Sequence, residues 1–524
     1  MVSRVRPVRL PAIVLLVALV LAACGSAPGG APAAPAGGAP TAPAGGAQGN
    51  ATITISLNAD PPSLDPAFSS AFVDRQVHNS IFDKLVDLDA NGKIVPMLAT
   101  EWKVSDDGLT YTFTLREGVK FQDGTDFNAE AVKTNLERYR TADKSTRKNE
   151  LKAVNTIEAV DAKTLKITLS EPFAPFLSVL TDRSGMIVSP KAITDQNGDI
   201  RNQPVGTGPF KYESRVKGDT ITLVRNDQYW QSGSPKAAKI VYKILTDPNT
   251  ELLNLKSGQV DFIDSVPPQE VANLKSDSNF AVVNDVGFGY QGIWFNTKAA
   301  PLDNKQVRQA IDMLIDRDEL VRVLFSGTAT PGNSPFAKSN LAYGESDAYT
   351  KPDVEKAKQL IAQSGVANPS FTLKVGTSAL QAQFAQLVQN FLKQGGIDMQ
   401  IEKVEFGTLL DQMDKKNYQG AALGWSGRPD PDQNIYDFFV TDGAQNDSAF
   451  ANPKVDELLK DARTQSDPAK RKADYDQAMQ ILHDEVPYVF LYHPNNVFGM
   501  TNKITGYTYV PDGIIRTVAM DKQQ

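Results

Sequence analysis

The chain has 524 residues, with 61 acidic against 54 basic side chains and a formal net charge of −7. This acidic balance, with the basic residues scattered along the chain, excludes nucleic acid as an expected partner. The single cysteine excludes an intrachain disulfide, and the length is sufficient for two or three domains, so a hydrophobic core must supply the stability.

The amino terminus has the features of an export signal. Three arginines precede an apolar run at residues 10–23, which is shorter than the roughly 20 residues of a membrane-spanning helix. The run ends in Leu-Ala-Ala-Cys at 21–24, which resembles the bacterial lipobox. We therefore expect residues 1–23 to be a lipoprotein signal peptide and Cys24 to carry the lipid. The alternative is an ordinary signal peptide with a chance cysteine.

A low-complexity segment follows the cysteine. Of residues 25–49, 22 are Gly, Ala or Pro and none is charged. Such a composition buries too little apolar surface to offset the entropy of ordering. We expect residues 24–50 to be a tether that keeps the following domains outside the cell, anchored to the cytoplasmic membrane.

Beyond the tether, strand and helix patterns are mixed throughout the chain. Alternation of apolar and polar residues predicts strands at 51–59, 109–115, 164–169 and 239–245. A helical period predicts helices at 127–139, 302–320, 353–363, 380–394, 453–463 and 468–485. Asn128 is the expected cap of the first helix; Asp303 is that of the second, with Gln306 closing a capping box. The mixture predicts an α/β protein.

Motifs typical of enzymes and metal sites fail on their spacing. The glycines of GFGYQG at 287–292 precede a strand pattern and not a helix. A calcium loop beginning at 430–434 would have Ile435 in place of its glycine and Thr441 in place of its glutamate, although a looser cation site stays open. GWSGR ends in Arg428 where a nucleophile elbow needs glycine. We therefore predict no enzyme activity, no cofactor and no metal.

Four segments carry a family resemblance. They are PPSLDPAFSS with the following stretch (61–70 and 81–132), PVGTGPF (204–210), WFNTKAAPLDNKQVRQAIDMLIDRD (294–318) and GWSGRPDPDQNIYDFF (424–439). In this order, behind a lipobox, they resemble solute-binding protein family 5. These are the large extracytoplasmic binding proteins of ABC importers that serve dipeptides, oligopeptides, glutathione, nickel and opines.

The resemblance implies a periplasmic-binding-protein fold of type II, in its large class, with two lobes, a hinge and an extra third domain. The expected divisions are lobe I at 51–83, 200–298 and 496–524, the extra domain at 84–199, and lobe II at 299–495. Ligand would lie in the cleft between the lobes and contact both, because only differential affinity for the closed state can drive closure.

The resemblance also implies the ligand-binding loop. Trp425 would stack on the ligand, and a carboxylate three residues later would hold a peptide's amino terminus, but Arg428 stands there. Arginine repels an ammonium and grips a carboxylate or phosphate. Either Asp430 or Asp432 takes over the amine, or the ligand is anionic at this end. The alternative is that Arg428 only pairs with one of these acids within its loop.

Weaker candidates complete the expected ligand site. They are Ser426, Tyr290, Phe72 and Ser70, with Trp294. Ser69 and Ser70 stand where peptide binders often carry an acid, which argues against a generic free peptide. For Tyr290 and Trp294 the alternative is an ordinary packing role at the lobe junction.

The leading hypothesis is a monomeric, lipid-anchored substrate-binding protein that captures a peptide-like or other polar organic solute. It would deliver this small molecule to the transmembrane subunits of an ABC permease. Two alternatives stay open: an exported hydrolase, and a non-transporting ligand sensor on the same fold.

Overall fold

The computed structural model describes residues 49–338, 340–344, 349 and 351–523. The predicted signal peptide, Cys24 and all but the end of the tether lie outside these residues. The chain divides into two compact units, and every described residue belongs to the second, Gly46–Gln524. Within the described part of the chain, no helix combines the length and apolarity that crossing a bilayer requires.

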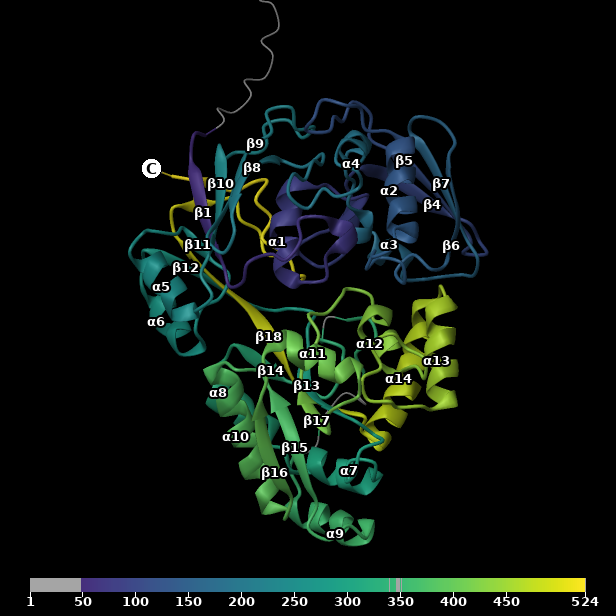
Figure 1. Cartoon of the computed structure of the whole chain (residues 1–524), viewed down its shortest axis with the longest axis vertical. Coiled ribbons are helices and arrows are strands. Elements are labelled where there is room, and N and C mark those ends of the chain that lie inside the picture. Colours follow the sequence, from purple (N-terminus) through teal and green to yellow (C-terminus); the bar gives the residue numbers. More distant parts are fainter. Residues whose placement is uncertain (1–48, 339, 345–348, 350, 524) are drawn as a thin grey trace, which may run out of the picture. The chain divides into compact units, whose positions relative to one another are not determined.

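Strands and helices are interspersed along this unit (Figure 1). The strands are β1 Thr52–Leu57, β2 Val86–Leu88, β3 Ile94–Pro96, β4 Ala99–Val104, β5 Thr110–Leu115, β6 Val154–Ala159, β7 Thr164–Leu169, β8 Phe210–Val216, β9 Thr220–Arg225, β10 Lys239–Ile244, β11 Phe262–Ile263, β12 Phe280–Val286, β13 Gln291–Phe295, β14 Ala329–Pro331, β15 Ser370–Val375, β16 Asp398–Lys403, β17 Gly420–Ala422, β18 Tyr488–Thr501, β19 Ile504–Thr505 and β20 Asp521–Lys522. The helices are α1 Phe72–Ile81, α2 Ala129–Thr141, α3 Phe176–Val179, α4 Pro190–Asp195, α5 Pro248–Lys256, α6 Val271–Ser276, α7 Lys305–Leu314, α8 Arg317–Phe325, α9 Val354–Ser364, α10 Ala379–Gln394, α11 Phe406–Asp414, α12 Asp432–Phe439, α13 Pro453–Thr464 and α14 Pro468–Glu485. The predicted α/β class is confirmed.

One long strand joins the two halves of the main sheet. The twelve-stranded sheet has the order β16-β15-β17-β13-β18-β11-β1-β10-β9-β8, and β12 and β14 also pair with β18. The first half of β18 pairs with β13 and β14, and its second half pairs with β11 and β12. A separate antiparallel sheet has the order β4-β5-β7-β6.

Local sequence patterns account for most elements. The residues Ile53, Ile55 and Leu57 of β1 are all buried, as the alternation predicts. The strands β5 and β7 alternate buried and half-buried residues along their whole length. Asn128 caps α2, since its side chain accepts a hydrogen bond from the amide of Ala131. The predicted capping of this helix is therefore confirmed.

The predicted helix at 302–320 is instead two helices, and its predicted cap is wrong. Asn304, not Asp303, caps α7 by accepting hydrogen bonds from two backbone amides. The chain then becomes extended at Ile315, and Asp316 caps α8 through the amide of Glu319. A Ser/Thr/Asp/Asn cap followed three residues later by Glu is itself a helix-start signal, so the sequence contained a second helix start inside the apolar stripe.

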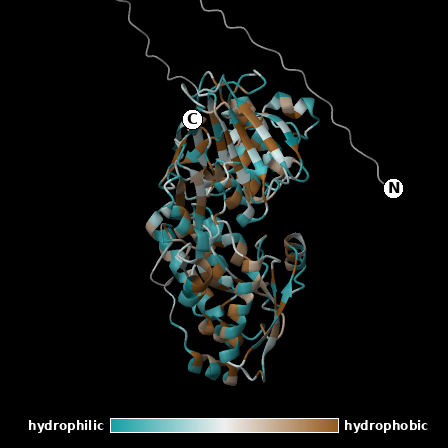
Figure 2. Cartoon of the chain, turned by 90° about the vertical axis from the view of Figure 1, so that its left-hand side faces the viewer, coloured by the Kyte–Doolittle hydropathy of each residue, from teal (hydrophilic) through white to brown (hydrophobic). Residues whose placement is uncertain are grey.

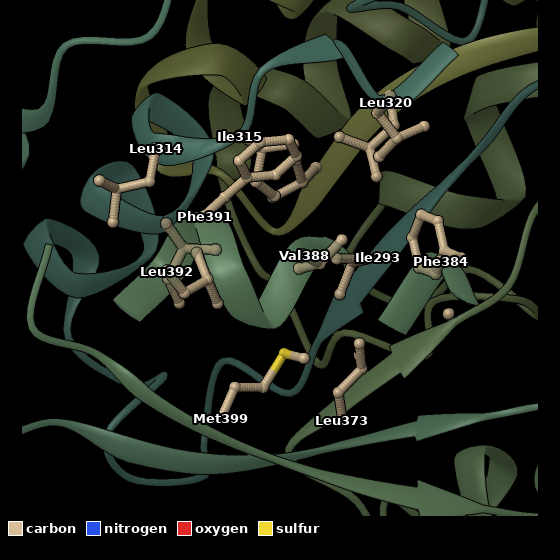
Figure 3. Packing of buried hydrophobic residues seen from close by; sticks show 14 of the residues in the cluster. Ile293, Leu314, Ile315, Leu320, Leu373, Phe384, Val388, Phe391, Leu392 and Met399 are labelled. Carbon is tan, nitrogen blue, oxygen red and sulfur yellow. The ribbon is translucent and has the colours of Figure 1, made fainter. Parts of the chain in front are cut away.

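Apolar cores join the helices to the sheets. Figure 3 shows Val388 of α10 beside Ile293 of the sheet, and Phe391 of the same helix beside Ile315. Another core packs α2 on the four-stranded sheet. Helices and strands carry both hydrophobic and hydrophilic residues, as amphipathic elements do (Figure 2). Because residues 46–524 form one compact unit, the lobe and domain boundaries stay a prediction.

Candidate ligand-binding site

The loop after β17 is tied to the start of β13. Trp425 and Tyr290 exchange backbone hydrogen bonds of 2.9 and 3.0 Å. Gly427 has φ +76°, and a Cβ there would lie 2.2 Å from the carbonyl oxygen of Phe288. Only glycine allows both this backbone conformation and this close approach. The loop therefore holds its residues in a defined place against the sheet.

A buried asparagine from α12 shapes the same loop. The side-chain oxygen of Asn434 accepts hydrogen bonds from the amide of Arg428 at 2.8 Å and from the indole of Trp425 at 3.2 Å. Its amide group donates to the carbonyl of Arg428 at 2.8 Å. Asn434 is fully buried, so one side chain determines how Trp425 and Arg428 are presented.

Arg428 reaches across to a segment far away in the sequence. Its Nε lies 3.2 Å from Oδ2 of Asp182, and both side chains are 8% exposed. Its Nη1 donates to the hydroxyl of Ser426 and the carbonyl of Gly427, and its guanidinium lies 4.7 Å from the ring centroid of Trp425. The ion pair joins the 424–439 segment to the region predicted as the extra domain.

Arg428 does not make the contacts of the alternative in which it pairs with an acid of its own loop. Asp430 instead accepts two hydrogen bonds from Arg471, at 3.0 and 2.7 Å. Asp432 accepts two from Arg463, at 2.8 and 2.9 Å. Both acids are therefore occupied by other arginines, and this favours the alternative in which the ligand is anionic near Arg428.

Two more arginines converge on Asp182. Its Oδ1 lies 3.0 Å from Nε of Arg75 and 3.7 Å from Nε of Arg183. Arg183 donates to the hydroxyl of Ser69, and Arg147 donates to the carbonyl of Ser69, each at 3.0 Å. The Nε of Arg183 is buried, and no hydrogen-bond partner for it exists among the described residues. We call Arg75, Arg147, Arg183 and Arg428 the arginine cluster.

The arginine cluster holds more positive charge than the protein neutralises. Burial lowers the pKa of Arg183 to about 9, and the neighbouring Arg147 adds to this effect. Burial opposes ionisation of Asp182, but the surrounding guanidinium groups, Arg75 first, hold its pKa well below the usual value. Beside Asp182, the nearby acids are Glu150, paired with Arg147, and Asp74, whose pKa is raised by burial. An anion would stabilise this cluster.

A cavity of about 460 Å³ lies beside this site, lined by residues from 149–173 and from 436–463. The helix α12 connects the Arg428 loop to the cavity. Its first turn follows that loop, and its later residues Tyr436 and Asp437 line the cavity. Two hydrogen bonds join residues 174–178 to residues 433–463, and we call this contact the interface. Ser178 donates to the side chain of Gln433 at 2.7 Å, and the amide of Ala174 donates to the carbonyl of Arg463 at 2.9 Å.

The other predicted residues divide between core and surface. Tyr290 is 1% exposed and Trp294 is 3% exposed, and both pack in one aromatic core. Their positions therefore fit the alternative expectation, that of ordinary packing residues. Phe72 is 36% exposed with the guanidinium of Arg75 over its ring. Ser70 is exposed, whereas Ser69 is buried within the arginine cluster.

Sequence reasoning missed the residues that partner Arg428. Asp182 and Arg183 form an Asp-Arg dipeptide, and Asp74 and Arg75 form another. Both dipeptides interrupt apolar stretches. Charged pairs at such positions are buried only when paired, and this was the signal available in the sequence. Asn434 carried no comparable signal.

The fold, with a candidate site between segments that are far apart in the sequence, is that of the periplasmic binding proteins. The structure matches the periplasmic binding protein DppA of Helicobacter pylori in complex with the peptide STSA, with a TM-score of 0.82, 29% identity and coverage of 91% of this chain and 99% of that one. It also matches AgaA of A. tumefaciens R10 in complex with agropinic acid, with a TM-score of 0.81, 28% identity and coverage of 90% and 99%.

Sequence comparison names the family. The glutathione-binding protein GsiB of Escherichia coli is 32% identical over 473 residues, covering 88% of this chain and 92% of that protein. Residues 93–447 match the family described as bacterial extracellular solute-binding proteins, family 5 Middle. The chain belongs to this family. It is an extracytoplasmic substrate-binding protein of an ABC transporter and not an enzyme, so the exported-hydrolase alternative is wrong.

Proposed function

We propose that the protein is anchored by a lipid on Cys24, captures a small peptide-like or other polar organic solute that bears a carboxylate, and delivers it to an ABC permease. The predicted lobe I (51–83, 200–298 and 496–524) and lobe II (299–495) would close over the ligand. The observation that carries the proposal is the arginine cluster, in which Arg428 meets Asp182 from the opposite side of the interface.

The similar proteins support a carboxylate-bearing ligand. Their names or titles give a peptide, agropinic acid and glutathione as ligands, and each of these molecules carries a carboxyl group. Arginine binds carboxylates through paired, charge-assisted hydrogen bonds. A buried cluster of guanidinium groups with incomplete neutralisation is a physical reason for the same preference in this chain.

The proposal is tested first by native mass spectrometry on the gently purified protein, followed by calorimetry with reduced glutathione, dipeptides and tripeptides. We expect an adduct of defined mass, or a dissociation constant on the order of micromolar or tighter for one of these probes. Absence of binding across all probes would overturn the peptide-like assignment. Tight binding without any loss of uptake in a deletion strain would favour the ligand sensor.

The lipid anchor is tested separately. The variant Cys24→Ala cannot accept a diacylglycerol, so it should leave the membrane fraction and appear in the soluble extracytoplasmic fraction. Fractionation followed by immunoblotting measures this change. A variant of the tether, Thr41→Ala, is the matched control and should stay with the membrane. Unchanged fractionation of Cys24→Ala would contradict the anchor.

A further inference from the structure

We propose that the carboxylate of Asp437 binds an ammonium group at the far end of the ligand, in the cavity beyond Arg428. The ligand is then a zwitterion whose carboxylate lies at the arginine cluster and whose amine lies against α12. This inference rests on the proposed function and adds to it the orientation of the ligand.

Asp437 differs from the other acids of its segment in having no protein partner. Asp430 and Asp432 each make a paired contact with an arginine. The carboxylate of Asp437 makes no hydrogen bond or ion pair with any described residue, although it is half-buried in the cavity wall. Burial raises its pKa, and Glu150 adds to this effect against the opposing charge of Arg463. A partly desolvated carboxylate without a partner is costly, and a ligand cation would offset that cost.

The charges change sign from one end of the interface to the other. At the Arg428 end, four guanidinium groups outnumber the nearby carboxylates. Around the cavity, the lining residues include four acids and three bases. One of those bases, Arg463, is already paired with Asp432, which does not line the cavity. A neutral or anionic group would gain nothing from Asp437, whereas a zwitterion aligned along α12 meets an opposite charge at each end.

The test compares free and blocked amines on matched proteins. The probes are reduced glutathione and trialanine, each with a free and with an acetylated amino group. Calorimetry is performed on the wild type, on Asp437→Asn and on Asp461→Asn, an exposed acid that does not line the cavity. We expect Asp437→Asn to weaken the free-amine probe at least about tenfold, the scale of a hydrogen bond to a charged group. The same variant should bind the acetylated probe as the wild type does, and Asp461→Asn should change neither.

The outcomes separate this inference from the proposed function. Equal affinity of wild type and Asp437→Asn for the free-amine probe overturns the assignment of Asp437 and leaves the proposed function standing. Equal weakening of free and acetylated probes, or the same loss in Asp461→Asn, overturns it as well. If the wild type binds none of the probes, the proposed function fails and this inference fails with it. Retained binding of the acetylated probe shows that the variant is folded.

Discussion

Arg428 lies where a ligand anion can use its free hydrogen-bonding capacity. Its Nε and Nη1 contact the protein, and its other terminal nitrogen makes no hydrogen bond to the described residues. Removal of the guanidinium in Arg428→Ala should weaken a carboxylate ligand by about 1.5–3 kcal/mol, or about 10- to 150-fold. Arg428→Lys should recover part of this loss. Calorimetry with glutathione measures both variants, and unchanged affinity would make Arg428 a purely structural residue.

Asn434 holds the loop of Trp425 and Arg428 in place, and we expect it to affect the ligand only through them. Asn434→Ala removes its three hydrogen bonds to Trp425 and Arg428 and leaves buried groups unpaired, at a cost of about 1–3 kcal/mol. We expect lower affinity as well as a lower melting temperature. The control is Asn296→Ala, which also removes buried amide hydrogen bonds but lies outside the site. Loss of stability with equal affinity in both variants would contradict the positioning role.

Glu251 and Asp264 form a buried carboxyl pair away from the ligand site. Ser56 donates to one oxygen of Glu251, and the amide of Asn58 donates to one oxygen of Asp264. The remaining oxygens, Oε1 and Oδ1, are buried without a donor among the described residues. Burial raises the pKa of both groups, and for Glu251 the charge of Asp264 raises it further. Burial and mutual repulsion therefore favour the protonated form at this pair.

This pair makes stability depend on pH. The unfolded carboxyl groups ionise near their usual pKa values of 4.5 and 3.8. Because the folded pKa values are raised, the contribution to stability is complete below the unfolded values and is lost as pH rises through the folded ones. Glu251→Gln should flatten the fall in melting temperature between about pH 5 and pH 9. An exposed control, Glu355→Gln, should keep the wild-type slope, and an identical slope for Glu251→Gln would contradict the pairing.

At the scale of elements, local patterns predict what is locally determined. The alternation in β5 and the cap of α2 are properties of neighbouring residues, so they could be predicted from the sequence. The break at Ile315 could not, because an uninterrupted apolar stripe concealed the second cap at Asp316. The same limit applies to the site. Trp425 and Arg428 follow from one motif, whereas the contact with Asp182 depends on how distant segments pack.

The strand β18 is the element that joins the two halves of the main sheet. Its pairing with β14 ends near His493, and its pairing with β12 begins directly after that point. The ring of His493 hydrogen-bonds the carbonyl of Gly289 at 2.9 Å. The second connection between the halves, from β12 to β13, passes through this glycine. Both connections thus meet at one place, which is where we expect the hinge of the predicted lobes.

At the scale of the whole molecule, we expect ligand affinity to depend on how readily the predicted lobes close without ligand. The hydrogen bond from Ser178 to Gln433 crosses the interface. Its loss in Ser178→Ala should reduce the closed population of the unliganded protein. The apparent dissociation constant is the intrinsic value divided by the closed fraction. We expect the affinity for every ligand to fall by one common factor, about two- to tenfold for a bond of about 0.5–1.5 kcal/mol. The radius of gyration without ligand should increase in X-ray scattering. Thr168→Ala, on the four-stranded sheet, is the control that should leave both unchanged. A factor that differs between free-amine and acetylated glutathione would mean that Ser178 contacts the ligand instead of acting through closure.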